Sequence, residues 1–424
     1  MQRMKRRIIT WLTKKERLEK YPFLRRFFWK RGPIYREMEQ RAALMRQKEV
    51  ITVVFLALDL PCWKCDSVFR LMQKHSRFRP IIWIVPELQI QDDDEKVRKL
   101  DEVVDYFETN QYAYVKDCSL EQLRERFNPD IIFLSKPYDG ITLWNICDFD
   151  RELVCYIPYA FQGAKSDGLL YGGENVVWRN FYTTRSIFKI AQDCMVNAGA
   201  NIALVGAPMS DVYLYDSYSE TSSNVWKTMP VRCTRVIWAP HWSIGNASWF
   251  NVSAFLEVAE GMCQIAVKYS DRIQFAFKPH PLLRDTLYQH PEWGKERTDS
   301  YYDFWAKLPN SQLETGLYSE LFKQSDAMIH DCGSFISEYL LVDKPCMYIT
   351  RDGAYNGFND ETLQALACYY KGKNVEAVDK FLQRLLSNAP DIMARKRKQF
   401  RDKYLVPPHG KSCAENVIEC ILNG

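Results

Sequence analysis

A strand, a polar turn and a helix are predicted over residues 325–348, and together they could bind a phosphate group. The sequence predicts a strand over Ala327–Ile329, a turn at Gly333 and Ser334, and a helix directly after the turn. Such a turn directs backbone N–H groups, a hydroxyl and the positive end of a helix toward one point, which favours an anion. Glu338 in that helix could accept hydrogen bonds from ribose hydroxyls. An ordinary βα unit with a capped helix has the same pattern, so both interpretations stay open for this segment alone.

A second polar segment follows the predicted strand Ile273–Phe277. It begins with Lys278 and places His280 between two prolines. Ligands of open α/β sheets bind beyond the carboxyl ends of the strands. The prolines restrict the backbone, so the imidazole of His280 is presented from a stiff loop. It could bond a diphosphate or protonate a departing phosphate oxygen, and the alternative is a loop histidine that only the backbone satisfies.

Two further histidines end neighbouring predicted strands. His241 follows the strand predicted over residues 235–238, and His330 with Asp331 ends the strand that precedes the Gly-Ser turn. Three of the six histidines of the chain therefore follow three strands of one predicted domain. This placement favours a shared polar site over coincidence.

Taken together, these segments resemble the CDP-glycerol glycerophosphotransferase family, the polyol-phosphate transferases of teichoic-acid and capsule synthesis. The resemblance is carried by Trp-Ala-Pro at 238–240, Phe-Lys-Pro-His-Pro at 277–281 and the segment 325–345. The segment 206–211 is similar to the family's Gly-x-Pro-Arg-x-Asp turn, with Met209 where arginine is usual.

The resemblance implies transfer of glycerol phosphate, or another polyol phosphate, from a CDP-activated donor to a lipid-linked glycan, with release of CMP. It implies a catalytic contact of His280 with the donor diphosphate. No metal or other cofactor is expected, and no nucleic-acid partner. The residues expected to bind the donor are Lys278, His330, Asp331, Gly333, Ser334 and Glu338.

The first predicted domain departs from the family pattern. The family has Trp-His-Gly there, and its histidine is thought to serve the acceptor, whereas this chain has Gln162 followed by Gly163 and Lys165 on the expected acceptor side. An amide cannot act as a general base near neutral pH. His241, which stands where the family has threonine, is therefore a candidate catalytic base or phosphate ligand. The alternative is that it packs beside Trp242.

The elements that must position these residues alternate between strand and helix. This alternation predicts an α/β fold of two doubly wound, parallel-sheet, Rossmann-like domains that face each other across a cleft, the glycosyltransferase-B type, which the resemblance also implies. Strands in the first domain are expected at 50–58, 81–85, 112–115, 131–134, 153–157 and 202–205. Expected bounds are 1–48 for a basic helical segment, 49–228 for the acceptor domain and 229–424 for the CDP-donor domain with its closing helices.

The first 31 residues are strongly basic and also carry Trp and Phe side chains. The whole chain has a net charge of +4, so the remainder is mildly acidic. This composition predicts an interfacial helix on an anionic membrane surface, and hence a peripheral protein at the cytoplasmic face of the bacterial cell membrane. A solvated basic helix packed on the body is the alternative.

Composition sets further bounds. A length of 424 residues predicts two or three domains, and thirteen cysteines without a framework indicate reduced thiols. Acidic residues at 92–94 are interpreted as a helix N-terminus and not as metal ligands. Two alternatives to the polyol-phosphate transferase stay open: a glycosyltransferase of the same fold that uses a nucleotide sugar, and a non-catalytic membrane scaffold that lost its base at Gln162.

Overall fold

The computed structural model describes residues 2–12, 33–88, 90, 93–136, 140–144, 146–163, 165, 173–195, 199–218, 224–244, 252–351, 353 and 357–424. The chain forms two compact units, which are described separately. Unit 1 comprises Met1–Gln162, Ser166–Tyr218 and Val406–Gly424, and unit 2 comprises Gly163–Lys165 and Ser219–Leu405. The C-terminal residues therefore differ from the expected bounds, because Val406–Gly424 belong to unit 1 and not to the second domain.

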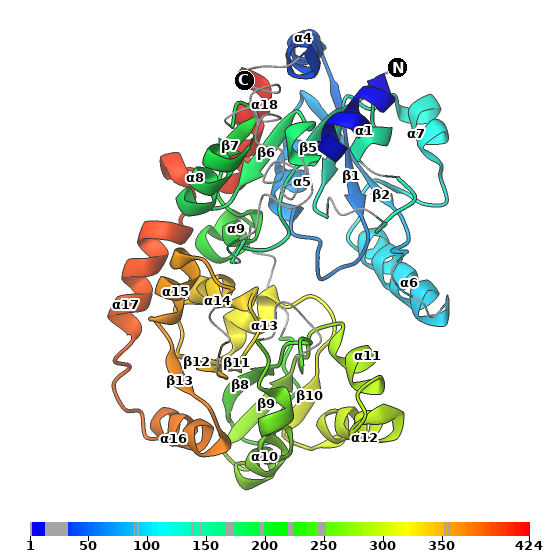
Figure 1. The fold of residues 1–424 in the computed structure, drawn as a ribbon. Helices are drawn as coiled ribbons and strands as arrows, with labels where there is room; N and C mark the ends of the chain where they lie inside the picture. The colour runs from blue at the N-terminus through cyan, green and yellow to red at the C-terminus, as the bar shows by residue number, and fades with distance from the viewer. Residues whose placement is uncertain are drawn as a thin grey trace. The chain divides into compact units, whose positions relative to one another are not determined.

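Unit 1 contains a seven-stranded sheet in the order β3-β2-β1-β4-β5-β6-β7 (Figure 1). Every pair of neighbouring strands is parallel. Its central strands are short apolar runs because both faces of the sheet are buried. The strands are β1 (Ile51–Ala57), β2 (Phe78–Ile84), β3 (Tyr114–Val115), β4 (Ile131–Leu134), β5 (Leu153–Tyr156), β6 (Arg179–Tyr182) and β7 (Ile202–Leu204).

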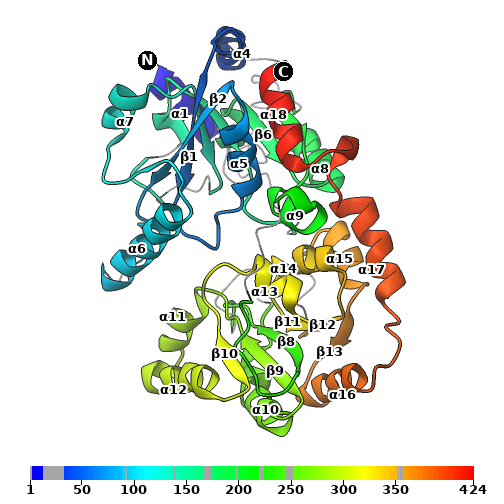
Figure 2. The same cartoon turned by 180° about the vertical axis from the view of Figure 1, so that it is seen from behind.

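Successive residues of β1 point into two separate cores of unit 1. Val53 and Phe55 belong to the core that includes residues of α5 and α18, which lie on the same face of the sheet (Figure 2). Val54 belongs to the core on the other face, with residues of α7. The helices of unit 1 are α1 (Gln2–Leu12), α4 (Pro33–Arg46), α5 (Asp66–Lys74), α6 (Asp93–Thr109), α7 (Leu120–Phe127), α8 (Arg185–Cys194), α9 (Pro208–Leu214) and α18 (Cys413–Asn423).

The carboxylate of Asp211 explains why the C-terminal helix belongs to unit 1. Its two oxygens accept hydrogen bonds from the backbone N–H groups of Cys413 at 2.8 Å and Ala414 at 3.0 Å. These are N–H groups of the first turn of α18, which the helix itself cannot satisfy. Ser412 and Glu415 add a capping box at the same end.

Unit 2 contains a six-stranded parallel sheet in the order β10-β9-β8-β11-β12-β13 (Figure 1). Its strands are β8 (Thr234–Ala239), β9 (Ile273–Phe277), β10 (Ser311–Leu313), β11 (Ala327–His330), β12 (Cys346–Ile349) and β13 (Tyr370–Gly372). Its helices are α10 (Phe255–Lys268), α11 (Leu283–Tyr288), α12 (Gly294–Lys307), α13 (Ser319–Gln324), α14 (Phe335–Glu338), α15 (Asp360–Leu366), α16 (Val375–Leu386) and α17 (Ala394–Phe400).

Each sheet has one point at which the strand order reverses. In unit 1 this point lies between β1 and β4, and in unit 2 it lies between β8 and β11. Loops at the carboxyl ends of such a strand pair separate to opposite faces of the sheet, which leaves a crevice for a ligand. The fold therefore specifies one candidate binding edge in each unit.

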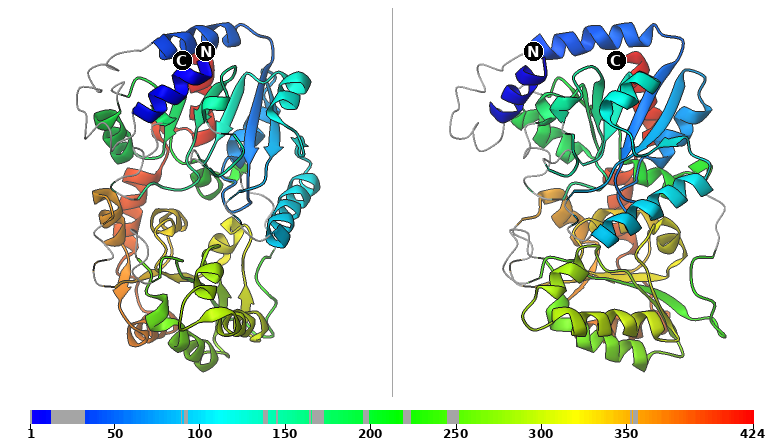
Figure 3. Two further views of the ribbon diagram at one scale, coloured as in Figure 1. Left: turned by 45° about the vertical axis from the view of Figure 1, so that its right-hand side comes forward. Right: turned by 90° about the vertical axis from the view of Figure 1, so that its right-hand side faces the viewer.

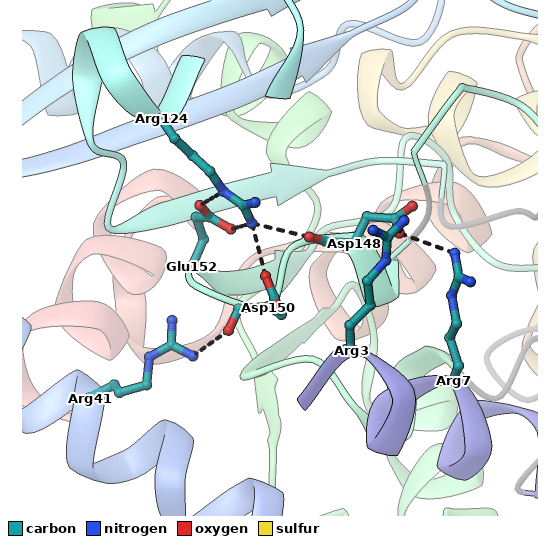
Figure 4. Close-up of polar contacts among 7 residues, drawn as sticks. All are labelled: Arg3, Arg7, Arg41, Arg124, Asp148, Asp150 and Glu152. Carbon is teal, nitrogen blue, oxygen red and sulfur yellow. Dashed lines mark hydrogen bonds and ion pairs between the residues drawn. The ribbon is translucent and has the colours of Figure 1, made fainter. Parts of the chain in front are cut away.

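Helix α1 lies against unit 1 (Figure 3). Arg3 and Arg7 both form ion pairs with the buried carboxylate of Asp148 (Figure 4). Thr10 Oγ1 lies 3.4 Å from Cys147 Sγ. The remainder of the predicted basic segment, residues 13–32, lies outside the described residues, as does Asp92 before α6. Among the helices that the structure describes, none is long and apolar enough to span a bilayer.

Candidate functional site

The carboxylate of Asp331 joins three segments at the strand-order reversal of unit 2. Its Oδ1 accepts a hydrogen bond from the backbone N–H of His241 at 2.5 Å, and its Oδ2 accepts from Ser253 Oγ at 2.9 Å and the Ala254 N–H at 2.8 Å. Ala254 is the N-cap residue of α10. Burial raises the pKa of Asp331 to about 7. Asp331 is completely buried, so its role is to hold these three segments together inside unit 2.

His241 is also buried, and its ring packs beside the ring of His280. Its Nδ1 is 2.8 Å from Ser243 Oγ, and its ring centroid is 4.9 Å from that of His280. Burial lowers the pKa of His241 to about 3, so the imidazole stays neutral and is a weak proton acceptor. This environment favours a positioning role for His241 over the role of catalytic base.

His280 is the half-buried histidine of this edge. Its backbone N–H donates to the Pro240 carbonyl at 3.0 Å, which ties the loop after β9 to the end of β8. Its Nδ1 accepts a hydrogen bond from the Leu282 N–H at 3.1 Å. Because Nδ1 accepts, the neutral ring carries its hydrogen on Nε2. The side chain therefore presents a hydrogen-bond donor of the kind that binds a phosphate oxygen.

His330 lies inside the core of unit 2 and not at its surface. Its ring centroid is 5.3 Å from those of Tyr348 and Tyr369, and its Nδ1 donates to the Cys332 carbonyl at 3.1 Å. Burial lowers the pKa of His330 to about 3. The sequence placed this residue among the expected donor ligands, and in the structure it is buried and contacts the turn that follows β11.

Lys278 and Glu338 are linked through Tyr318. The Nζ of Lys278 donates to the Gly316 carbonyl at 2.9 Å and lies 4.8 Å from the centroid of the Tyr318 ring. The Tyr318 hydroxyl donates to Glu338 Oε2 at 2.9 Å, and both residues are buried. Sequence reasoning missed Tyr318, because it lies in an irregular segment without a motif.

Gly333 and Ser334 form the half-buried turn between β11 and α14. The Ser334 side chain makes no capping bond to α14, and its Oγ lies 3.2 Å from Cys332 Sγ. The α-helix that follows is only four residues long and continues as the 3-10 helix Tyr339–Val342. The turn is thus held by the buried cysteine and histidine beside it.

The expected acceptor-side residues are divided between the two units. Gln162 belongs to unit 1, whereas Gly163 and Lys165 belong to unit 2. The Gly163 carbonyl accepts hydrogen bonds from the Asn359 N–H at 2.9 Å and Thr362 Oγ1 at 3.0 Å. A Cβ on Gly163 would lie 3.0 Å from Thr362 Oγ1, so glycine permits this close approach. In the described part of the chain, no cluster of His, Cys, Asp and Glu could hold a metal ion.

Two doubly wound parallel sheets, with a polar edge at a strand-order reversal, define a protein of the glycosyltransferase-B type and confirm the predicted fold class. Solved structures that contain UDP or UDP-GlcNAc share this fold. The Staphylococcus aureus MnaA–UDP structure is 11% identical over 88% of this chain and 96% of that chain, with a TM-score of 0.55. The Neisseria meningitidis UDP-GlcNAc 2-epimerase bound to UDP-GlcNAc is 13% identical over 88% and 100%, with a TM-score of 0.52.

A variant of the wall teichoic acid polymerase TagF, soaked with CDPG, is 14% identical over 92% of both chains, with a TM-score of 0.55. No curated protein sequence matches the chain. The model of the CDP-glycerol:poly(glycerophosphate) glycerophosphotransferase family matches residues 179–423, more than half of the chain, so the protein belongs to that family. It is therefore a transferase with CDP-glycerol as its glycerophosphate donor, and the resemblance read from the sequence is confirmed.

Proposed function

We propose that this transferase moves glycerol phosphate from CDP-glycerol, or a related polyol phosphate from its CDP donor, to a lipid-linked glycan in teichoic-acid or capsule synthesis. CMP is the leaving group. The observation that carries the proposal is the position of the His280 imidazole beside the strand-order reversal of unit 2, where bonds to Pro240 and Leu282 hold it.

His280 is the proposed catalytic residue. Its Nε2–H donates a hydrogen bond to an oxygen of the donor diphosphate and stabilises the charge that develops on the departing CMP. His241 packs against the ring of His280 and keeps its orientation. Transfer of a phosphoryl group depends mainly on such positioning and electrostatic stabilisation.

The turn after β11 is the proposed site for the donor phosphates and ribose. Backbone N–H groups at Gly333 and Ser334 bind phosphate oxygens, and the Glu338 carboxylate binds ribose hydroxyls. Tyr318 fixes the orientation of Glu338 through its 2.9 Å hydrogen bond. Lys278, His330 and Asp331 bond to Gly316, Cys332 and the His241 N–H and so hold the segments that carry these groups, and we do not expect them to bind the donor directly.

Donor specificity tests the proposal. Purified protein is incubated with CDP-glycerol, CDP-ribitol, UDP-glucose and UDP-GlcNAc, and the release of CMP and UDP is measured. We expect CMP release from a CDP-polyol, and an increase of the melting temperature with CMP and CDP but not with UMP, because ligands that bind the native state stabilise it. Turnover of UDP-sugars alone would favour the nucleotide-sugar transferase, and nucleotide binding without any turnover would favour the scaffold.

Association with an anionic membrane surface through residues 1–31 is part of the proposal. Within α1, Met4, Ile8 and Trp11 share one helix face and are 68%, 50% and 55% exposed. Arg3 and Arg7 pair with Asp148 and so hold helix α1 against unit 1 (Figure 4). The apolar stripe remains exposed.

Flotation with liposomes containing phosphatidylglycerol tests the membrane contact. We expect the wild-type protein to float, less so as salt rises, since exposed charges are screened within about 8 Å at physiological ionic strength. Deletion of residues 1–31 should abolish flotation, and Trp11→Ser should weaken it. Leu44→Ser on α4 is the matched control, because Leu44 is 65% exposed but lies outside the segment. Equal flotation of the deletion variant and the wild type would refute the contact.

A further inference from the structure

A group of charged side chains lies at the strand-order reversal of unit 1. The proposed donor site in unit 2 does not use this edge. Asp59 follows β1, Glu87 follows β2 and Lys136 follows β4. A small hollow at this edge is lined by Asp59, Lys136, Ser135, Cys62 and the aromatic ring of Trp63. Ligands of doubly wound sheets bind at this edge.

The group is built around Lys136. Its Nζ donates to Asp59 Oδ2 at 2.7 Å and lies 3.3 and 3.4 Å from the two carboxylate oxygens of Glu87. The side chains of Lys136, Asp59 and Glu87 are 9%, 16% and 14% exposed. Burial disfavours its charge, but the neighbouring anions still raise the pKa of Lys136. The lysine is therefore a fixed cation between two carboxylates.

The two carboxylates differ in how firmly they are held. Asp59 Oδ1 accepts the Cys62 N–H at 2.7 Å while Oδ2 accepts from Lys136, so both oxygens have close partners. Although burial opposes ionisation, the charge of Lys136 lowers the pKa of Asp59, which remains an anion. Glu87 is held by longer contacts to Lys136. Glu87 is therefore the carboxylate that can rotate to a ligand while Asp59 keeps the lysine in place.

The chemistry of this charged group, of which Asp59 and Lys136 line the hollow and Glu87 lies beside it on Lys136, favours a hydroxyl-rich ligand without charge at the bound end. Two carboxylates and one lysine leave a net negative charge, which disfavours a phosphate. Carboxylate oxygens accept hydrogen bonds from hydroxyl groups, and the ammonium donates to hydroxyl oxygens. The Tyr159 ring, 5.9 Å from Lys136 Nζ, and Trp63 supply apolar surface for the carbon skeleton of a polyol or sugar.

We propose that Asp59, Glu87 and Lys136 form the subsite for the hydroxyl end of the acceptor, with Glu87 accepting the hydrogen bond of the acceptor hydroxyl. This inference rests on the proposed transfer to a polyol or sugar hydroxyl. It supplies unit 1 with an acceptor contact that does not depend on Gln162, whose amide cannot accept a proton near neutral pH. Asp59 and Lys136 act as positioning residues, because they orient the glutamate.

The test uses the full chain, CDP-glycerol and a lipid-free glycerol phosphate oligomer as acceptor. Glu87→Gln keeps the shape but removes the charge, and we expect the KM for the acceptor to rise at least tenfold. The KM for CDP-glycerol should stay within about twofold, and Glu87→Asp should recover part of the loss. Glu102→Gln on α6 is the matched control, since the Glu102 side chain is 50% exposed and pairs with Arg98.

Saturation-transfer NMR with the same oligomer gives a second readout that needs no turnover. The wild-type protein should transfer magnetisation to the terminal glycerol protons, and Glu87→Gln should lose most of this signal. Equal signals for the wild type and Glu87→Gln, or no signal for the wild type, would overturn the proposed subsite. The wild type could fail to release CMP from CDP-glycerol and still give a stronger NMR signal than Glu87→Gln. That result would refute the proposed transfer but would support the polyol subsite.

Discussion

Replacing Tyr318 by Phe tests whether Glu338 binds the ribose of the donor. The phenol oxygen donates a 2.9 Å hydrogen bond to Glu338 Oε2, whereas the ring packs 4.7 Å from Phe322 and 5.0 Å from Phe335. Phenylalanine keeps the ring and removes only the hydroxyl. The substitution therefore releases the carboxylate of Glu338 and leaves the surrounding core intact.

The size of the effect follows from the buried hydrogen bond. A hydrogen bond to a charged group contributes about 1.5–3 kcal/mol. If about 1–2 kcal/mol of this energy serves to orient Glu338 toward the ribose, CMP binds about 5- to 30-fold more weakly to the variant. 2′-Deoxy-CMP lacks one of the two ribose hydroxyls, so its affinity should fall less, and the preference of the wild type for CMP should shrink.

Isothermal titration calorimetry with CMP and 2′-deoxy-CMP measures both affinities. Tyr288→Phe is the matched control, because the Tyr288 hydroxyl donates to the carboxylate of Asp299 at 2.6 Å outside the proposed site. The control should bind both nucleotides as the wild type does. Unchanged CMP affinity in Tyr318→Phe, or an equal loss for both nucleotides, would refute the assignment of Glu338 to the ribose.

Two further predictions concern the buried histidines. His241→Ala should lower kcat about tenfold without changing the shape of the pH profile, since a positioning residue does not titrate in the reaction. Loss of the acidic limb of the profile, where a base becomes protonated, would instead identify His241 as the base. Gln162→His should not restore the activity. His330→Phe should lose less stability than the wild type as the pH falls from 7 to 5, because burial lowers the native pKa of His330 to about 3 and the unfolded state binds the proton first. Urea unfolding at the two pH values measures this difference, and parallel losses in both proteins would contradict it.

The strands that the sequence predicted well are buried apolar runs. The bounds of β4 and β9 agree with the predicted runs 131–134 and 273–277. Strand β6 was missed because its sequence, RNFY, has no apolar run. Arg179 is buried there and pairs with Glu39 of α4 at 2.7 Å, a contact that spans 140 residues. The edge strands β10 and β13 are short and partly polar, so their local signal is weak.

The candidate site was predictable in position but not in orientation. Polar residues at strand ends indicated the edge of unit 2, yet His330 and Asp331 point into the core, which only tertiary packing determines. Charged residues at strand ends can be found in the same way, and a search for them would have identified Asp59 and Lys136 after the first and fourth strands of unit 1. The place of α18 in unit 1 depends on hydrogen bonds to Asp211, about 200 residues away in sequence, and has no local signal.

The role of His280 is tested most directly by the rate of CMP release from CDP-glycerol by His280→Ala and by His290→Ala. The two histidines are a matched pair, since each is half-buried and accepts at Nδ1 the N–H of the residue two positions later, Leu282 at 3.1 Å and Glu292 at 3.3 Å. Loss of a group that assists the leaving phosphate lowers turnover by a factor on the order of 100 or more. We expect this loss for His280→Ala, with unchanged thermal stability, and wild-type turnover for His290→Ala. Near-normal CMP release by folded His280→Ala would show that this imidazole does not act on the donor diphosphate.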